Sequence, residues 1–281
     1  MGKIVDGIKD ESIRQRMQGV IEEHPGRISP ENFIPDPDKT ELFELVCKDD
    51  DVIWVPKDSL IKIKVGESVD TVPEMILPSK AVEHVIRNAS HRVIMNFCVC
   101  RESLQCKDYP IEIGCIFLGD TARDIHPELG REATVDEALE VAARARELGL
   151  VHCVGRSGFD PLWLDVAPAN KLFTICNCCP CCCITRTIPY AMPIIGEGFQ
   201  RMPGIKITVT DDCLGCGTCV EEACLFQAVS IEDGRAVINE DACRACGRCA
   251  NFCPEEAIEI TIDDPNYIEK TIEHLTKLNY K

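Results

Sequence analysis

Apolar residues recur at helical spacing in three stretches of the chain. The stretches are Asp10–Glu23, Lys80–His91 and Thr134–Leu148. In each of them, positions three or four residues apart are apolar while most of the others are polar, which is typical of a helix with one buried face. We therefore predict three amphipathic helices. Their buried faces would carry Ile13, Met17, Val20 and Ile21; Val82, Val85, Ile86 and Ala89; and Ala138, Leu139, Ala142, Ala145 and Leu148.

The third helix also carries signals for its start and its end. Thr134 followed by Glu137 has the spacing of a capping box, and Gly149 follows the last apolar position, where glycine commonly ends a helix. Runs rich in β-branched residues stand close to cysteines in the same part of the chain and predict strands. These runs are Arg92–Asn96, Leu150–Val154 and Lys171–Ile175.

The composition limits the classes of protein to which the chain can belong. Of its 281 residues, 45% are hydrophobic and only 5% aromatic, so aliphatic side chains must fill the cores of about two domains. The formal net charge is −17. Such a surface repels nucleic acid and anionic membranes, and it suits docking to a basic patch on a partner protein.

Neither a membrane span nor an export signal is visible. No stretch approaches about 18 continuous apolar residues, so we predict no spanning helix. The N-terminal sequence MGKIVDGIKDESIRQR lacks the apolar core of a signal peptide. We therefore expect a soluble, cytoplasmic protein.

The 20 cysteines are distributed very unevenly. Eleven lie within Cys98–Cys183, eight lie within Cys213–Cys253, and only Cys47 lies outside both groups. Without an export signal disulfides are not favoured, and neighbours such as Cys181 and Cys182 are expected to point apart. Thiolates bunched at spacings of two and three residues are typical of metal ligands. So many oxidisable thiols also favour an anaerobic organism as the source.

Prolines and glycines mark a boundary between the two cysteine groups. Residues 188–204 read IPYAMPIIGEGFQRMPG, with three prolines and three glycines, which is typical of a connection. We therefore predict a cysteine-rich N-terminal domain over residues 1–200, a second domain over residues 201–262 and a C-terminal helix over residues 263–281. The N-terminal domain would be a mixed α/β unit, and the whole chain falls in the α+β class.

The C-terminal cysteines form two copies of one motif, each with three cysteines two residues apart and a distal cysteine. One loop of this kind can hold three corners of an iron–sulfur cube, and the fourth ligand must come from elsewhere. Each copy continues into a predicted short helix and strand, which indicates internal duplication. The copies are Cys213, Cys216, Cys219 and Cys224 with the helix Leu225–Val229 and the strand Ser230–Glu232, and Cys243, Cys246, Cys249 and Cys253 with the helix Glu256–Ile258 and the strand Glu259–Ile262.

This stretch of about 60 residues resembles the bacterial-type ferredoxins that carry two [4Fe-4S] clusters. In that family the distal cysteine of each motif binds the other cluster, and each cluster transfers one electron at a time. The resemblance implies one cluster on Cys213, Cys216, Cys219 and Cys253 and a second on Cys243, Cys246, Cys249 and Cys224.

The first copy departs from the family pattern. Four residues rather than three precede Cys224, and Leu225 stands where the family has proline, as Pro254 does in the second copy. We expect the extra residue to bulge without removing the ligand. Two zinc sites are the alternative for these eight thiolates, although zinc ribbons usually pair two Cys-x-x-Cys knuckles.

The N-terminal cysteines follow an unusual pattern. Ten of them fall in two patches far apart in sequence, which suggests that the fold brings the patches together around metal. The pattern, CVCR followed by CNCC-x-CCC, resembles a family of anaerobe iron–sulfur proteins that join such a domain to a ferredoxin domain and have no settled activity. The ten candidate metal ligands are Cys98, Cys100, Cys106, Cys115, Cys176, Cys178, Cys179, Cys181, Cys182 and Cys183.

Four interpretations of these ten thiols remain open. They could hold a third [4Fe-4S] cluster, a larger or non-cubane cluster with a catalytic role, or zinc, or they could be free structural thiols. The pairing loosely resembles the cysteine-rich domains of heterodisulfide reductases, but the Cys-Cys-Gly of that family is absent because Pro180 follows Cys179.

Four further residues need an interpretation. Cys47 and Cys153 stand among apolar residues and are expected in the core. Arg101 could offset cluster charge or bind an anion, or could be a surface or helix-start arginine. His152 could relay protons or bind iron, but a satisfied core histidine on a strand is favoured. The chain shows no phosphate-binding loop, nucleophile elbow or dinucleotide fingerprint.

Together these features predict an iron–sulfur electron-transfer protein that relays single electrons through two [4Fe-4S] clusters and a third cluster to redox partner proteins. The alternative is a reductase whose N-terminal cluster binds substrate at an open iron and is fed by the ferredoxin domain. A redox sensor or assembly platform is a third hypothesis. The number of cysteines on the N-terminal cluster separates the first two, since four make a carrier and three leave an iron open to substrate.

Overall fold

A seven-stranded sheet lies at the centre of the computed structural model of the chain, which describes residues 4–24, 45–56, 61–63, 78–186, 198–262, 264, 266–278 and 280. All neighbouring strands of this sheet are antiparallel except the parallel pair β1 and β8. In spatial order the strands are β5 (Gly130–Glu132), β3 (Arg92–Met95), β4 (Ile116–Leu118), β7 (Phe173–Cys178), β6 (Val151–Arg156), β1 (Asp51–Val55) and β8 (Phe199–Arg201).

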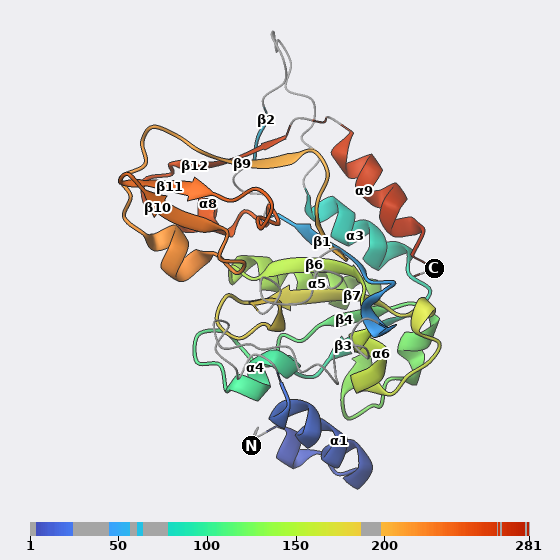
Figure 1. The fold of residues 1–281 in the computed structure, drawn as a ribbon. Coiled ribbons are helices and arrows are strands. Elements are labelled where there is room, and N and C mark those ends of the chain that lie inside the picture. Colours follow the sequence, from blue (N-terminus) through green and yellow to red (C-terminus); the bar gives the residue numbers. More distant parts are fainter. Residues whose placement is uncertain are drawn as a thin grey trace.

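Helices cover both faces of this sheet. One face packs against α3 (Ser79–Asn88), α5 (Val135–Glu147) and α9 (Tyr267–Thr276), and α9 lies beside α3 (Figure 1). The other face packs against α1 (Glu11–Glu22) and α6 (Phe159–Leu164) at one end. A short helix α4 (Val99–Leu104) and the short helical turns η1 (Val5–Gly7), η5 (Asp120–Asp124) and η6 (Ala169–Lys171) complete this part.

The three long helices follow their sequence patterns closely. The α5 helix has the predicted capping box between Thr134 and Glu137, and Gly149 follows it with a φ of 78°. The α3 helix ends at Asn88, three residues before the predicted end, because Ala89 is extended and Arg92 donates to the carbonyls of the last turn. The residues buried on α1, α3 and α5 are Ile13, Met17 and Ile21; Ser79, Ala81, Val82, Val85 and Ile86; and Ala138, Ala142 and Ala145.

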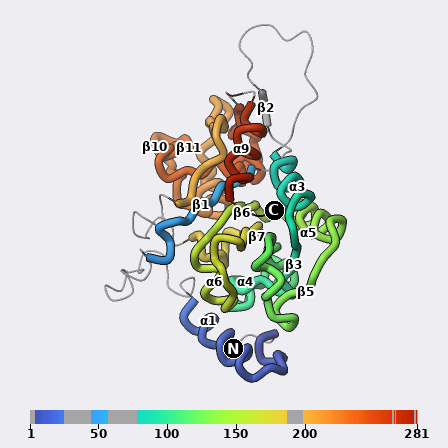
Figure 2. Tube along the Cα trace, turned by 90° about the vertical axis from the view of Figure 1, so that its right-hand side faces the viewer, coloured from blue at the N-terminus to red at the C-terminus, as the bar shows by residue number. Residues whose placement is uncertain are grey.

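The C-terminal cysteine motifs lie in a smaller unit built on two sheets. The hairpin β10 (Val229–Glu232) and β11 (Arg235–Ile238) forms one, and β2 (Ile61–Ile63), β12 (Ile258–Ile262) and β9 (Ile205–Val209) form the other. Figure 2 shows this unit stacked over one end of the central sheet. Among the described residues, no helix is long and apolar enough to cross a membrane.

The two halves share buried contacts rather than meeting at a simple linker. Gln200, near which we placed the boundary, lies in β8 and pairs with β1 of the central sheet. At the end of the chain, Tyr280 packs on Phe173 with ring centroids 5.1 Å apart. Most of the predicted linker, residues 187–197, lies outside the described residues.

The short helices predicted after the distal cysteines are wrong. The helical turns come before these cysteines, as the π-helical turn η8 (Cys219–Ala223) and the α-helix α8 (Arg248–Phe252). After each distal cysteine, Gln227 and Glu256 adopt left-handed φ values of 52° and 50°, which a right-handed helix does not allow. The chain then enters β10 and β12.

Candidate metal centres

Strand pairing brings the two N-terminal cysteine patches onto one face of the central sheet. Cys176 lies opposite Cys153 in the β6–β7 pair, and Ile175 pairs with Ile116 of β4. Because side chains alternate along a strand, Cys115, Cys153 and Cys176 point to the same face. The Sγ atoms of Cys115 and Cys176 are 3.3 Å apart. The fold therefore joins segments that are some 60 residues apart in sequence, as the sequence predicted.

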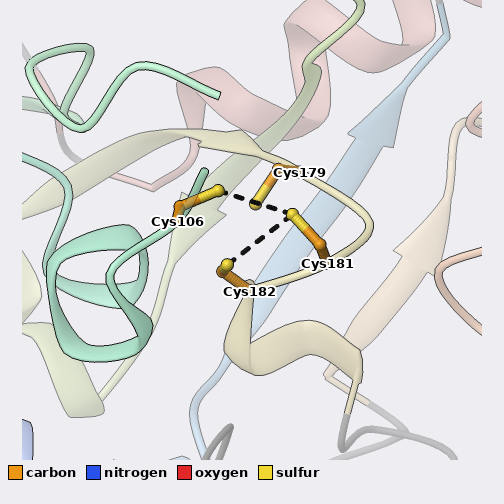
Figure 3. Close-up of side chains that lie close together, drawn as sticks. All are labelled: Cys106, Cys179, Cys181 and Cys182. Carbon is orange, nitrogen blue, oxygen red and sulfur yellow. Dashed lines mark hydrogen bonds between the residues drawn. The ribbon is translucent and has the colours of Figure 1, made fainter. Parts of the chain in front are cut away.

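Four of the ten thiols form a compact group. The Sγ atoms of Cys106, Cys179, Cys181 and Cys182 all lie within 4.8 Å of one another. Cys106 follows α4, whereas the other three lie on the turn that follows β7, and Figure 3 shows the four sulfur atoms turned toward one another. The Cys181 sulfur lies 3.5 Å from that of Cys106 and 3.6 Å from that of Cys182. We call these four residues the compact group.

The expectation that Cys181 and Cys182 point apart is wrong. The chain turns at Pro180–Cys182, so consecutive side chains leave the backbone on the same side of the turn instead of alternating as they would along a strand. All 20 cysteines are nevertheless free thiols. Hydrogen bonds from Cys181 and Cys182, followed by the charge of Arg101, hold the pKa of the Cys179 thiol well below its usual range.

The other six candidate ligands form a second, more extended group. Its thiols shift one another's pKa values: Cys183 and Cys98 raise that of Cys100, and Cys100 and Cys178 lower that of Cys183. The hydrogen bonds from Cys115 and Cys178 lower the pKa of the Cys176 thiol to about 5. Of the described residues, no three in this set have sulfurs that all lie within 4.8 Å. The extended group is Cys98, Cys100, Cys115, Cys176, Cys178 and Cys183.

Arg101 lies between the two groups, near the start of α4, so it is a helix-start arginine, but its interpretation as a surface arginine is wrong. Its residue is 1% exposed, and its guanidinium donates to the carbonyls of Pro110 (2.8 Å), Asn177 (2.8 Å) and Ile113. Burial lowers the pKa of this guanidinium. The charges of the neighbouring thiolates, Cys98 and Cys179 first, raise this pKa by a larger amount, so the net shift is upward and the group stays charged. Arg101 therefore offsets negative charge from both groups at once.

His152 is a core histidine, as favoured from the sequence. It is 2% exposed on β6, and its Nδ1 lies 2.9 Å from Oδ1 of Asn177. Burial, followed by the charge of Arg146, lowers its pKa to about 4, so the ring is neutral near pH 7.

Cys153 and Cys47 are both buried, as expected. Burial raises the pKa of the Cys153 thiol to about 11, but the thiol also hydrogen-bonds Cys178 of the extended group. Cys153 is not among the ten predicted ligands, and only its strand register with Cys176 reveals that it borders the site.

The first ferredoxin motif forms a pocket together with the distal cysteine of the second. This pocket is lined by Ile231 of β10, by Ile258 of β12 and by four cysteines, Cys213, Cys216, Cys219 and Cys253. Burial raises the pKa of the Cys219 thiol, and the nearby charges of the other three cysteines raise it further. Cys216 is exposed, and Leu214 beside it is 70% exposed, so this pocket faces the surface.

The second motif gathers with the distal cysteine of the first. Burial raises the pKa of the Cys246 thiol to about 12 and that of the Cys249 thiol well above its usual range. The nearby charges of Cys246, Cys243 and Cys224 raise the pKa of the Cys249 thiol further. Cys246 and Cys249 are buried, whereas Cys243 and Cys224 are partly exposed. This set is therefore more buried than the first, which contains the exposed Cys216.

The two motifs share one backbone design despite their different lengths. Gly215, Gly217, Ala245 and Gly247 all have left-handed φ values, between 51° and 84°. The backbone N–H groups of Ala228 and Ala257 donate to the distal sulfurs Cys224 and Cys253 at 3.3 Å each. The extra residue before Cys224 is taken up by the π-helical turn η8, which holds one more residue per turn than α8.

The buried motif lies directly against the extended group. Cys178, Cys183 and Cys246 belong to one buried cluster, and Cys224 and Cys243 pack on it. Trp54 of β1 meets Phe226 edge to face at 4.8 Å within this cluster. Arg248, 2% exposed, crosses the same contact and donates to Tyr109 Oη at 2.6 Å and to the Gly149 carbonyl.

Comparison with known proteins finds similarity in the C-terminal part. Residues 236–259 match the family described as "4Fe-4S binding domain". The chain is 30% identical over 67 residues to a subunit of the ion-translocating oxidoreductase complex of Methanosarcina acetivorans, covering 24% of this chain and 25% of that protein. It is 36% identical over 59 residues to a subunit of the Na(+)-translocating ferredoxin:NAD(+) oxidoreductase complex of Acetobacterium woodii, covering 21% and 17%.

A third relative is "Pyruvate synthase subunit PorD" of Thermotoga maritima, 39% identical over 49 residues that cover 17% of this chain and 46% of that protein. The chain thus spans less than half the length of each of these relatives. No solved structure matches it. The C-terminal part of the chain therefore contains a ferredoxin-type 4Fe-4S binding domain, whose chemistry is iron–sulfur electron transfer.

Proposed function

We propose that the chain is an electron carrier with three iron–sulfur clusters in a row. The outer cluster would be held by Cys213, Cys216, Cys219 and Cys253. The inner cluster would be held by Cys243, Cys246, Cys249 and Cys224. A third [4Fe-4S] cluster would be held by four cysteines of the extended group.

One observation carries this proposal: the buried cluster that contains cysteines of both the inner set and the extended group. Each of these clusters would take up one electron with little change in geometry, and short separations through a dry core favour transfer between them. The exposed outer set, at Cys216 and Leu214, would be where a partner delivers or takes electrons. The acidic surface, with a net charge of −17, suits a redox partner with a basic patch.

The extended group favours a carrier over a reductase. It offers six thiols where a cube needs four, so each iron can have a thiolate and none is left open for substrate. The named relatives are subunits of larger oxidoreductases. We infer that this chain likewise hands electrons to a separate redox protein.

The test is a count of iron and acid-labile sulfide in the anaerobically purified full-length chain. We expect about twelve irons and about twelve sulfides, as three cubes require. The triple variant Cys100→Ala, Cys176→Ala, Cys178→Ala leaves three of the six thiols, too few for a cube, and should lose about four of each, whereas the control Cys47→Ala, which lies in neither group, should lose none. A wild-type count of eight or fewer irons, unchanged in the triple variant, would contradict the third cluster.

A further inference from the structure

We propose that the compact group, Cys106, Cys179, Cys181 and Cys182, is a separate site for one divalent, thiolate-binding metal ion, either zinc or ferrous iron. It would be distinct from the iron–sulfur cluster on the extended group. The ten N-terminal thiols would then form two sites of different kinds.

The spacing of the sulfurs carries the proposal. Four thiolates bound tetrahedrally to one ion at a bond length of about 2.3 Å lie about 3.8 Å from one another. In the compact group the Cys181 sulfur lies 3.5 Å from that of Cys106 and 3.6 Å from that of Cys182, and all four sulfurs lie within 4.8 Å of one another. A four-iron cube places irons and sulfides between its cysteines, so its thiolates must stand farther apart. The compact group has no room for such a core.

The extended group provides the contrast within the same fold. The Cys115 and Cys176 sulfurs of this group lie 3.3 Å apart, but among the described residues no three of its sulfurs come within 4.8 Å of one another. That arrangement can open around a larger core. A tetrahedral set of four sulfur ligands is typical of zinc or of iron.

The charge balance is also suitable for a closed single-ion site. Four thiolates and one divalent ion leave a net charge of −2, which is costly in a buried place. Cys179 and Cys182 are 1% and 6% exposed, and the buried Arg101 hydrogen-bonds Cys179. The Arg186 guanidinium donates to the Cys181 carbonyl at 2.5 Å and fixes the turn that carries three of the ligands.

Such an ion would have a structural role, because its four protein ligands leave no open position. It would tie the loop after α4 to the turn after β7, two segments 75 residues apart in sequence. This tie would hold the backbone that presents Cys183 and Cys178 to the neighbouring cluster. Cys106 also lines a surface hollow together with Tyr109 and Glu102, so metal can reach the site from solvent.

The test measures zinc, iron and acid-labile sulfide per chain in anaerobically purified full-length protein. We expect Cys106→Ser and Cys181→Ser, which lie on different segments and are partly exposed, each to lose one metal ion and no sulfide. The loss will appear as zinc or as iron, according to which ion is bound. The matched triple variant Cys100→Ala, Cys176→Ala, Cys178→Ala, in the extended group, should instead lower iron and sulfide together. A loss of several irons with equal sulfide from Cys106→Ser, or no loss of metal, would overturn the proposal.

A second measurement needs no variant. Cobalt(II) is added to wild-type protein after mild chelation has removed the single ion, and its X-ray absorption is recorded. A shell of four sulfurs with no metal neighbour is expected. Nitrogen or oxygen ligands, or a metal neighbour, would overturn the proposal even if the iron count of the other clusters were as proposed.

Discussion

Two buried arginines place positive charge beside the cysteine sets. Arg101 is fixed by three backbone carbonyls between the compact and extended groups. Arg248 lies between Cys246 and Cys249, where the first motif has Thr218. A nearby cation favours the reduced form of a cluster, because reduction adds a negative charge. The inner cluster should therefore be easier to reduce than it would be without Arg248.

We expect Arg248→Met to lower the reduction potential of the inner cluster by about 60 mV, the equivalent of about 1.4 kcal/mol for one electron. Methionine keeps the length of the side chain and removes the charge. Arg248→Lys, which keeps the charge, should shift the potential much less. An anaerobic redox titration followed by EPR spectroscopy measures both, and an unchanged or higher potential in Arg248→Met would contradict the electrostatic role.

His152 should make the stability of the protein depend on pH. Its pKa in the folded protein is about 4, against 6.5 for an ordinary histidine, because burial and Arg146 disfavour the charged ring. The unfolded chain therefore binds a proton first as the pH falls. The stability linked to His152 is fully present above pH 6.5 and is lost between pH 6.5 and about 4.

The loss amounts to about 3 kcal/mol at most, since one pKa unit corresponds to about 1.4 kcal/mol. We expect the unfolding temperature of the wild-type chain to fall more steeply from pH 7.5 to pH 5 than that of His152→Gln. Comparing the two chains anaerobically removes the contribution of acid damage to the clusters, which both share. Parallel pH profiles would show that His152 is not the titrating group.

At the scale of elements, the sequence predicted a helix most accurately where the residues that start and end it lie next to it in the chain. Thr134, Glu137 and Gly149 fix both ends of α5 through backbone hydrogen bonds within one turn, and the predicted boundaries agree with the structure. The prediction of helices after the distal cysteines failed because Gln227 and Glu256 adopt left-handed conformations. These conformations accompany the hydrogen bonds from backbone N–H groups to the distal sulfurs. No helical propensity reveals such contacts.

The exchange of distal cysteines between the two motifs yields a prediction that runs against proximity in sequence. Cys224→Ala should damage the inner cluster, which would be held by Cys243, Cys246 and Cys249, and leave the outer cluster closer to native. The reason is that Cys224 adds to the charge around Cys249, whereas Cys253 lies in the pocket of the first motif. Cys253→Ala is the matched variant and should damage the outer cluster.

EPR spectra of the reduced variants distinguish the two clusters, because the outer one lies near solvent and the inner one is buried. If Cys224→Ala selectively removes the cluster of its own loop, the exchange of ligands does not occur in this chain.

At the scale of the whole molecule, the sequence predicted that the two N-terminal cysteine patches come together, but not how their cysteines divide into groups. Spacing alone placed the eight ferredoxin cysteines in two motifs, because their ligands lie close together along the chain. The grouping of the ten N-terminal cysteines depends on strand register, which places Cys153 opposite Cys176 and Ile116 opposite Ile175. Register follows from the pairing of distant segments, so neither the two groups nor the position of Arg101 between them was visible in the sequence.

The cysteine-rich half and the ferredoxin half share one hydrophobic core. The β8 strand, Met202 and α9 all pack on elements of the first half, so a chain cut near Gln200 would expose part of that core. Point variants in the full-length chain therefore test the account better than truncation does.

The central claim is that an iron–sulfur cluster on the extended group lies in electronic contact with the ferredoxin domain. The most direct test is the integrated EPR intensity of the fully reduced, full-length protein, compared with that of the triple variant Cys100→Ala, Cys176→Ala, Cys178→Ala, which keeps only three of the six thiols. With one unpaired spin for each reduced cluster, the account predicts about three spins per chain for the wild type, broadened by interaction between neighbours, and about two for the variant. Two spins in both proteins, with superimposable spectra, would contradict it.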